Sequence, residues 1–433
     1  MRKVFVIAST LLLLIVTGAA QTTTSSHPVL TTVSTPENGG FSSERLKRVD
    51  NVIKEYVEKE KMNGAVSLII RNGKIVHYKA FGYDADPNTP LKKDAIFRIA
   101  SQTKAITSVA VMMLYEEGKF MLDEPVSNYI PEFKNPKVID KFNKADTTYT
   151  TTPAKREVTI RDLLTHTSGI GYAQIGSSEA NAMYAKAGVV GGIGVDKLVL
   201  GDGMKKLGSL PLFHNPGEQW TYGLNTDLLG YLVEVVSGMT LDEFFRKRIF
   251  EPLGMKDTYF YLPKEKYDRL TMLYTEDKTT KKAVKMQEKI VIGGKPFYRD
   301  YPILEGTYYS GGGGLSSTII DYAIFLQMML NGGEYNGKRI LSRNSVRMMT
   351  MNQVGDLNVG ANKFGLGFGI TTERGSAAIP TQEGTFDWGG MFATTYWVDP
   401  KEKLIGLLYR NIWPTSNNLG NLYKVLVYQA INN

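Results

Sequence analysis

The sequence contains no cysteine and only four histidines, which are His27, His77, His166 and His214. Without thiols, the chain cannot form a disulfide scaffold, a thiolate-bound zinc or iron–sulfur site, or a cysteine nucleophile. The histidines lie far apart along the chain, and no two of them have the i, i+4 spacing of a helical metal site. We therefore expect chemistry that uses neither a metal nor another cofactor.

Long apolar runs are also missing, except for one short run at the start. Residues 4–16 are apolar, Arg2 and Lys3 precede them, and Gly18, Ala19 and Ala20 follow. This order is typical of a secretory signal peptide over residues 1–20, and the run is shorter than the roughly 20 residues that span a membrane. The absence of a following cysteine excludes a lipid-anchored lipoprotein. We expect a protein that is exported to the periplasm or secreted, with no stable membrane insertion after cleavage.

The rest of the composition is ordinary, with 42% hydrophobic and 22% charged residues, which favours a globular chain. The net charge is +8, but the lysine-rich segment 264–295 also carries Glu and Asp and few aromatics. Such a segment is typical of a solvated surface, so we expect no nucleic-acid partner. Thr and Ser dominate residues 21–40, which predicts a flexible tail before a domain over residues 41–433.

Strand patterns lie at both ends of the chain and helical patterns lie between them. Residues 65–70 and 75–81 form a predicted hairpin through Asn72-Gly73, and residues 394–398 and 404–409 are further strands. Helical spacing marks residues 43–61, 101–117, 226–236, 241–249, 318–330 and 419–431. The pattern predicts an α/β fold in which an antiparallel sheet from both chain ends is flanked by helices. The sheet lobe would hold about residues 41–121 and 306–433, with a mainly helical lobe over residues 122–305 inserted into it.

Ser101 and Lys104 form an S-x-x-K motif at the start of an apolar helix. Residues three apart share one helix face, so the lysine amine can reach the serine hydroxyl. The helix N-terminus and burial both lower a lysine pKa, so a neutral amine could take the serine proton. The alternative is an N-cap serine followed by an exposed lysine, but the apolar helix favours an inward lysine.

Several further motifs follow in order along the chain. These are Leu163-Leu164-Thr165-His166-Thr167-Ser168-Gly169, Trp220-Thr221-Tyr222-Gly223-Leu224-Asn225, Glu251-Pro252-Leu253-Gly254-Met255 and Trp388-Gly389-Gly390. Together with the S-x-x-K motif they resemble the class C-like branch of the serine β-lactamase superfamily. That branch includes class C β-lactamases, D-alanyl-D-alanine peptidases and carboxylesterases. The resemblance covers about residues 43–430 and implies the β-lactamase/transpeptidase-like fold.

The resemblance also implies roles for individual residues. Ser101 would be the nucleophile that forms an acyl-enzyme, Lys104 its activating base, and Tyr222 a partner in proton transfer. The backbone N–H groups of Ser101 and Met391 would form the oxyanion hole. Substrate would bind at Trp388, Gly389 and Gly390, and at Asn225 if this residue replaces the asparagine of the second motif. In related proteins the segment around His166 is structural, and we expect the same here.

Two departures from the family pattern bear on the substrate. Leu224 occupies the usual asparagine position of the second motif, with Asn225 one residue later. Trp388 replaces the usual lysine of the third motif, which removes a cation for a β-lactam or peptide carboxylate. Simple packing remains an alternative role for Trp388. We expect an exported serine hydrolase that cleaves esters or related small acyl compounds. The alternatives are a β-lactamase or D-alanyl-D-alanine-type peptidase, and a non-catalytic binder of cell-wall peptides.

Overall fold

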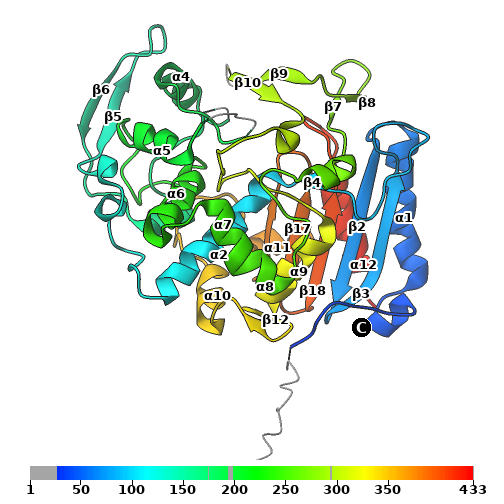
Figure 1. Ribbon diagram of the computed structural model, residues 1–433. Coiled ribbons are helices and arrows are strands. Elements are labelled where there is room, and N and C mark those ends of the chain that lie inside the picture. The colour runs from blue at the N-terminus through cyan, green and yellow to red at the C-terminus, as the bar shows by residue number, and fades with distance from the viewer. Residues whose placement is uncertain (1–26, 174, 194–197, 293–294, 433) are drawn as a thin grey trace, which may run out of the picture.

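A central eight-stranded sheet draws its strands from both ends of the chain, as the sequence predicts (Figure 1). The computed structural model describes residues 27–173, 175–193, 198–292 and 295–432, so the predicted signal peptide lies outside the described residues. The strand order is β1-β3-β2-β18-β17-β16-β15-β14. The bounds of these strands are β1 Thr31–Thr32, β2 Gly64–Arg71, β3 Lys74–Gly82, β14 Lys363–Phe364, β15 Gly369–Ile370, β16 Phe386–Gly389, β17 Thr395–Asp399 and β18 Leu404–Tyr409.

The first strand differs from the expectation in two ways. β1 runs parallel to β3, whereas every other neighbouring pair in the sheet is antiparallel, so the sheet is mixed. β1 and the following 3₁₀ helix η1 (Pro36–Gly39) also lie within the segment that the composition predicts to be a flexible tail. The ordered fold therefore begins before residue 41, because the two β-branched threonines of β1 pair with the open edge of β3.

The hairpin between β2 and β3 confirms the local prediction. Asn72 and Gly73 have φ of 53° and 75°, which is the left-handed pair that a two-residue hairpin turn needs. Alternate residues of β2 then face opposite sides of the sheet. Ala65 and Ile69 pack in one apolar cluster and Val66 and Leu68 in another.

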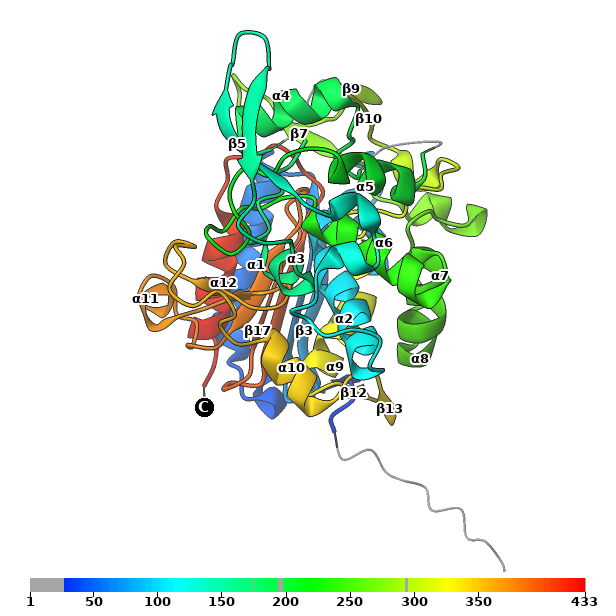
Figure 2. The ribbon, with the colours of Figure 1, turned by 90° about the vertical axis from the view of Figure 1, so that its left-hand side faces the viewer.

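Helices cover both faces of the sheet (Figures 1 and 2). α1 (Ser43–Glu58) and α12 (Leu419–Gln429) pack against each other on one face. α2 (Thr103–Glu116) and α9 (Ile319–Leu330) lie in the main core on the other face. Thr318 caps the N-terminus of α9 by accepting a hydrogen bond from Asp321 N–H, which fixes where that helix begins.

Most helices of the middle of the chain lie beyond α2, on the side away from the sheet, whereas the segment with Tyr274 and Ala283 pairs with Ile412 and Glu60 at one end of the sheet (Figures 1 and 2). The helices of this middle region are α3 Ile160–Thr165, α4 Ser178–Ala187, α5 Leu200–Gly208, α6 Asn225–Ser237, α7 Leu241–Phe245, the π-helical turn η5 Arg246–Phe250, and α8 Glu251–Leu253. Gly238 ends α6 in the left-handed conformation, and Thr240 and Glu243 form a capping box at the start of α7.

The middle region also contains strands that the sequence reading did not predict. Three hairpins form here: β5 Lys137–Phe142 with β6 Tyr149–Pro153, β7 Tyr274–Glu276 with β8 Ala283–Lys285, and β9 Lys289–Ile292 with β10 Lys295–Tyr298. These strands are three to six residues long and mix charged, polar and apolar residues, so no regular apolar alternation marks them.

Short elements complete the described chain. They are the pairs β4 Phe97–Arg98 with β11 Ser316–Ser317 and β12 Glu334–Tyr335 with β13 Lys338–Arg339, the helices α10 Arg343–Met349 and α11 Glu373–Ser376, and the 3₁₀ turns η2 Ala100–Gln102, η3 Val126–Asn128, η4 Pro131–Phe133, η6 Lys264–Arg269 and η7 Tyr301–Ile303. Among the helices of the described chain, none is long and apolar enough to cross a membrane.

Candidate active site

Ser101 stands in a sharp turn between a strand and a helix. β4 ends at Arg98, Ala100 takes a left-handed φ of 44°, and the 3₁₀ turn η2 leads directly into α2. A non-glycine residue in this conformation is strained and persists only when its surroundings hold it. Ala100 is fully buried in a small apolar cluster with Phe297 and Phe392. Packing therefore holds the turn that presents Ser101.

Lys104 and Tyr222 both contact the hydroxyl of Ser101. Lys104 Nζ lies 3.3 Å from Ser101 Oγ, and the Tyr222 hydroxyl donates to the same oxygen at 2.7 Å. The ammonium of Lys104 also lies 4.7 Å from the centre of the Tyr222 ring. The structure thus brings together the three residues that the sequence places in catalysis, although they are separated by up to 121 positions.

Tyr172 belongs to the same cluster, and the sequence reading missed it. Its hydroxyl accepts a hydrogen bond from Lys104 Nζ at 3.2 Å, and the Gly312 carbonyl accepts another at 2.6 Å. With Ser101, these groups give the three hydrogens of a lysine ammonium three acceptors. No spacing rule marks Tyr172, and the one available signal was its place six residues after His166 in the same loop.

The charge on Lys104 differs from the expectation. Burial lowers the pKa of its ammonium, but Tyr172, Tyr222 and the buried carboxylate of Asp227 raise it more, so the pKa lies above its usual value. Burial raises the pKa of Tyr172, which keeps that hydroxyl protonated at neutral pH. The expected neutral amine is therefore not the resting state: Lys104 is a buried cation whose charge the surrounding oxygens stabilise.

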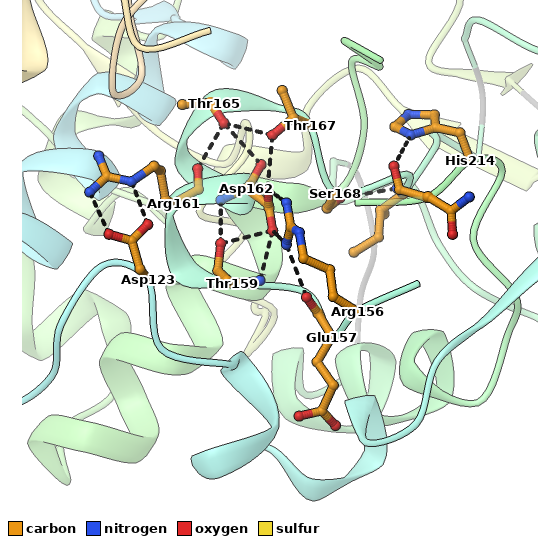
Figure 3. A network of polar contacts seen from close by, with 12 residues as sticks. Asp123, Arg156, Glu157, Thr159, Arg161, Asp162, Thr165, Thr167, Ser168 and His214 are labelled. Atoms are coloured by element: carbon orange, nitrogen blue, oxygen red, sulfur yellow. Dashed lines mark hydrogen bonds and ion pairs between the residues drawn. The ribbon is translucent and has the colours of Figure 1, made fainter. Parts of the chain in front are cut away.

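A polar network holds α3 and the start of the loop that follows it (Figure 3), and Tyr172 lies further along this loop. Asp162, in the first turn of α3, accepts two hydrogen bonds from Arg156 at 2.5 and 2.9 Å and caps the helix with Thr159. Its carboxylate also accepts from the Thr167 hydroxyl at 3.2 Å. The network therefore holds the chain as it leaves α3 toward Tyr172.

Asn225 does not reach the substrate space, in contrast to the expectation from the second motif. Its side chain is fully buried, its amide lies 2.9 Å from His166 Nδ1, and its oxygen accepts a hydrogen bond from Ser168. It stands at the first position of α6 and faces the loop after α3. The correction follows from the one-residue shift relative to Tyr222, which turns the side chain into the protein.

His166 takes part in the same structural contacts. The residue ends α3 with φ of 58°, and its ring packs 4.9 Å from the ring of Tyr222. Burial and the charge of Lys104 hold the pKa of His166 well below its usual range, so the ring is neutral. Its position behind Tyr222 agrees with the structural role that the sequence reading assigned to this segment.

The third motif lies directly beside the turn of Ser101. A Cβ on Gly390 would meet Ile99 O at 2.4 Å and Thr394 Oγ1 at 2.2 Å, so only glycine fits this approach. Trp388 lies on β16, with its ring 5.7 Å from that of Tyr222. Met391 follows the glycines, and its N–H donates to no other described residue.

Two cavities meet at Ser101 and Tyr222. The apolar cavity has a volume of about 280 Å³, and its walls include Tyr172, Ile193, Ile292, Phe297, Met391 and Trp413. The polar cavity has a volume of about 440 Å³, opens more widely, and is lined by Trp388, Gly389 and Gly390 together with Asp387, Asn421 and Lys424. The hydroxyl of Ser101 therefore lies at the junction of the two cavities, beside the bond that would join the apolar and the polar part of one bound molecule.

Comparisons with known proteins agree with this geometry. A family model described as Beta-lactamase matches residues 49–429, and the chain therefore belongs to the β-lactamase family. Esterase EstB of Burkholderia gladioli is 30% identical over 84% of this chain and 90% of its own length. Lovastatin esterase of Penicillium rubens is 29% identical over 83% of this chain and 91% of its own.

Solved structures show the same fold. EstCE1, a hydrolase with promiscuous acyltransferase activity, superposes with a TM-score of 0.75 at 24% identity, over 90% of this chain and 98% of its own. Simvastatin synthase (LovD) of Aspergillus terreus gives 0.75 at 22% identity, over 89% and 98%. The protein is thus a β-lactamase-family serine hydrolase. Its relatives include esterases and a putative D-alanyl-D-alanine carboxypeptidase of Escherichia coli, which is 29% identical over 89% of this chain and 86% of its own.

Proposed function

We propose that the protein is an esterase that cleaves esters of apolar acyl groups through an acyl-enzyme on Ser101. The observation that carries the proposal is the position of Ser101, which is bonded to Tyr222 and Lys104 at the mouth of an apolar cavity. An alkyl acyl group would gain about 25 cal/mol for each Å² of apolar surface that it buries there. The alcohol half of the ester would lie toward the polar cavity.

The first half of the reaction forms the acyl-enzyme. Ser101 Oγ attacks the ester carbonyl carbon, and its proton passes to the oxygen of Tyr222 as the hydroxyl proton of Tyr222 moves toward the alcohol oxygen of the ester. The ammonium of Lys104 lies 4.7 Å from the centre of the Tyr222 ring, so it stabilises the negative charge that develops on the tyrosine oxygen during this transfer. The N–H groups of Ser101 and Met391 hold the negative oxygen of the tetrahedral intermediate. Tyr222 then gives the proton to the departing alcohol as the C–O bond breaks.

The second half returns the enzyme to its starting state. A water molecule enters through the polar cavity after the alcohol has left, and Tyr222 takes its proton. The hydroxide attacks the acyl carbon, the bond to Ser101 Oγ breaks, and Ser101 regains a proton from Tyr222. The carboxylic acid product leaves with the apolar group that the apolar cavity held. Apart from the ester and this water molecule, the steps described here use only groups of the chain.

Trp388 supports an ester over a β-lactam or a peptide. A substrate carboxylate at the third motif would meet an indole ring instead of an ammonium, so a charge-assisted hydrogen bond is lost at this position. Asn225, which would bind a substrate amide in the second motif, is bonded within the protein instead. Both departures weaken recognition of the amide and carboxylate that β-lactams and cell-wall peptides carry.

A comparison of three substrates tests the proposal. Purified protein and the Ser101→Ala variant are assayed with 4-nitrophenyl hexanoate, a chromogenic cephalosporin and a D-alanyl-D-alanine peptide. We expect kcat/KM for the ester to exceed that for the other two by at least about 100-fold, and the variant to lose the activity. A cephalosporin or peptide kcat/KM equal to that of the ester would refute the ester preference.

We also propose that the protein acts outside the cytoplasm, because residues 1–20 have the order of a signal peptide. Expression of the full chain with a C-terminal tag, followed by fractionation and N-terminal sequencing, tests this. A mature N-terminus near Gln21 in the exported fraction is the expected result. An intact Met1 in the cytoplasmic fraction would contradict it.

A further inference from the structure

The polar cavity contains an ion pair that the proposed ester chemistry does not use. Lys424 on α12 donates from Nζ to Asp387 Oδ2 at 3.0 Å, and the two side chains are 14% and 27% exposed. Both residues line the cavity together with Ser101 and Tyr222. Asp387 precedes Gly389 by two positions on β16, so about 7 Å of strand separates them.

Much of the hydrogen-bonding capacity of this cavity is unused. Among the described residues, none bonds to Asp387 Oδ1 or to the side-chain amide of Asn421, and Lys424 Nζ makes one hydrogen bond out of three. The cavity therefore offers acceptors and donors at the same place. A ligand with several hydroxyl groups can satisfy both kinds of group at once.

The charges of the cavity favour a neutral ligand. An anion that approaches Lys424 also meets the carboxylate of Asp387, and a cation that approaches Asp387 also meets the ammonium of Lys424. A hydroxyl group can donate to the carboxylate and accept from the ammonium, and hydrogen bonds to charged groups are stronger than those between neutral groups. Neutral polyhydroxylated molecules therefore match the ion pair best.

We propose that the polar cavity is the subsite for the alcohol half of the ester, and that this alcohol is a neutral polyol such as glycerol or a sugar. This inference rests on the proposed esterase function and names its substrate class: an apolar acyl group joined to a polyol. The hydroxyls of the polyol contact Asp387, Asn421 and Lys424, while the ester carbonyl lies at Ser101. When the acyl–oxygen bond breaks, the polyol takes the proton from Tyr222 and leaves through the open cavity.

Two esters with the same acyl group test the inference. The assay compares 1-monohexanoyl glycerol with ethyl hexanoate, which yield the same acyl-enzyme and differ only in the alcohol. We expect the wild-type protein to favour the glycerol ester by at least about tenfold in kcat/KM, mainly through KM. Lys424→Met and Asp387→Asn should each lower kcat/KM for the glycerol ester about tenfold, and lower that for the ethyl ester less than about threefold.

A second lysine–aspartate pair supplies the matched control. Lys79 pairs with Asp50 between β3 and α1, away from both cavities that meet at Ser101. Lys79→Met should leave the ratio of the two esters unchanged.

Three results would overturn the inference. The first is equal kcat/KM for the two esters in the wild type, and the second is an equal loss for both esters in the Lys424 and Asp387 variants. The third is a higher kcat/KM for hexanoylcholine or for an ester of glycolic acid than for the glycerol ester. In all three cases, hydrolysis that depends on Ser101 would leave the esterase proposal intact. A wild-type protein that turns over none of these esters would instead refute the esterase function, and the subsite with it.

Discussion

Replacement of Asn225 by alanine separates a structural asparagine from a substrate-binding one. The fully buried side chain bonds to His166 at 2.9 Å and accepts from Ser168, so the change leaves two buried polar groups without this partner. Each such loss costs about 1–3 kcal/mol. The Ser168 hydroxyl also accepts a hydrogen bond from Ile170 N–H at 3.0 Å, so it keeps one partner in the variant. Its contribution to the loss of stability is therefore smaller than that of His166. We therefore expect Asn225→Ala to lower the stability by about 2–4 kcal/mol.

Calorimetry and kinetics on the same samples measure the two roles separately. A loss of this size should lower Tm by roughly 2–5 °C in a domain this large, while kcat/KM for 4-nitrophenyl hexanoate at 20 °C should fall less than about tenfold. Asn358→Ala, at an exposed turn, is the control and should leave both values unchanged. An unchanged Tm together with a 100-fold loss of kcat/KM would refute the structural role and indicate instead that Asn225 binds substrate.

Three further changes test other parts of the site and fold. Tyr172→Phe removes one of three acceptors from Lys104, and we expect kcat to fall about tenfold with little change in KM; an unchanged kcat would show that Tyr172 only packs. Gly390→Ala would place a Cβ 2.4 Å from Ile99 O and so push the third motif away from the turn that carries Ser101. Esterase activity should therefore fall at least about 100-fold. Full activity would mean that the chain can move apart at this contact without harm to the site. Burial lowers the pKa of His77 to about 4, so between pH 6.5 and 4 the unfolded chain binds a proton that the folded chain does not. Tm should therefore fall as the pH is lowered from 6.5 to 4. The decrease should be less steep in the His77→Gln variant. Equal slopes for the two proteins would contradict that assignment.

The sequence predicts those parts of the fold that local physics determines. The Asn72-Gly73 turn, the capping box of Thr240 and the glycine that ends α6 were all recognisable, because each depends on a few neighbouring residues. The short strands β14 and β15 were not, because two residues cannot show an alternating pattern. Their pairing depends on β16, which is recognisable only once the sheet is assembled.

The candidate site divides in the same way. Ser101 and Lys104 are one turn apart, and Tyr222 belongs to a motif, so the sequence indicates all three. Tyr172 depends on how the loop after α3 folds back to Lys104, and no local pattern encodes that contact. The reversed shift of the Lys104 pKa has the same origin, because the oxygens that stabilise its charge come from distant parts of the chain.

The esterase proposal depends most directly on one covalent bond. Protein incubated with a fluorophosphonate probe is digested and mapped by mass spectrometry, with Ser101→Ala as the control. We expect stoichiometric labelling of Ser101, slower labelling in Tyr222→Phe, and none in the alanine variant. Labelling at another residue, or an unlabelled Ser101 in protein that still hydrolyses 4-nitrophenyl hexanoate, would contradict the assignment of Ser101 as the nucleophile.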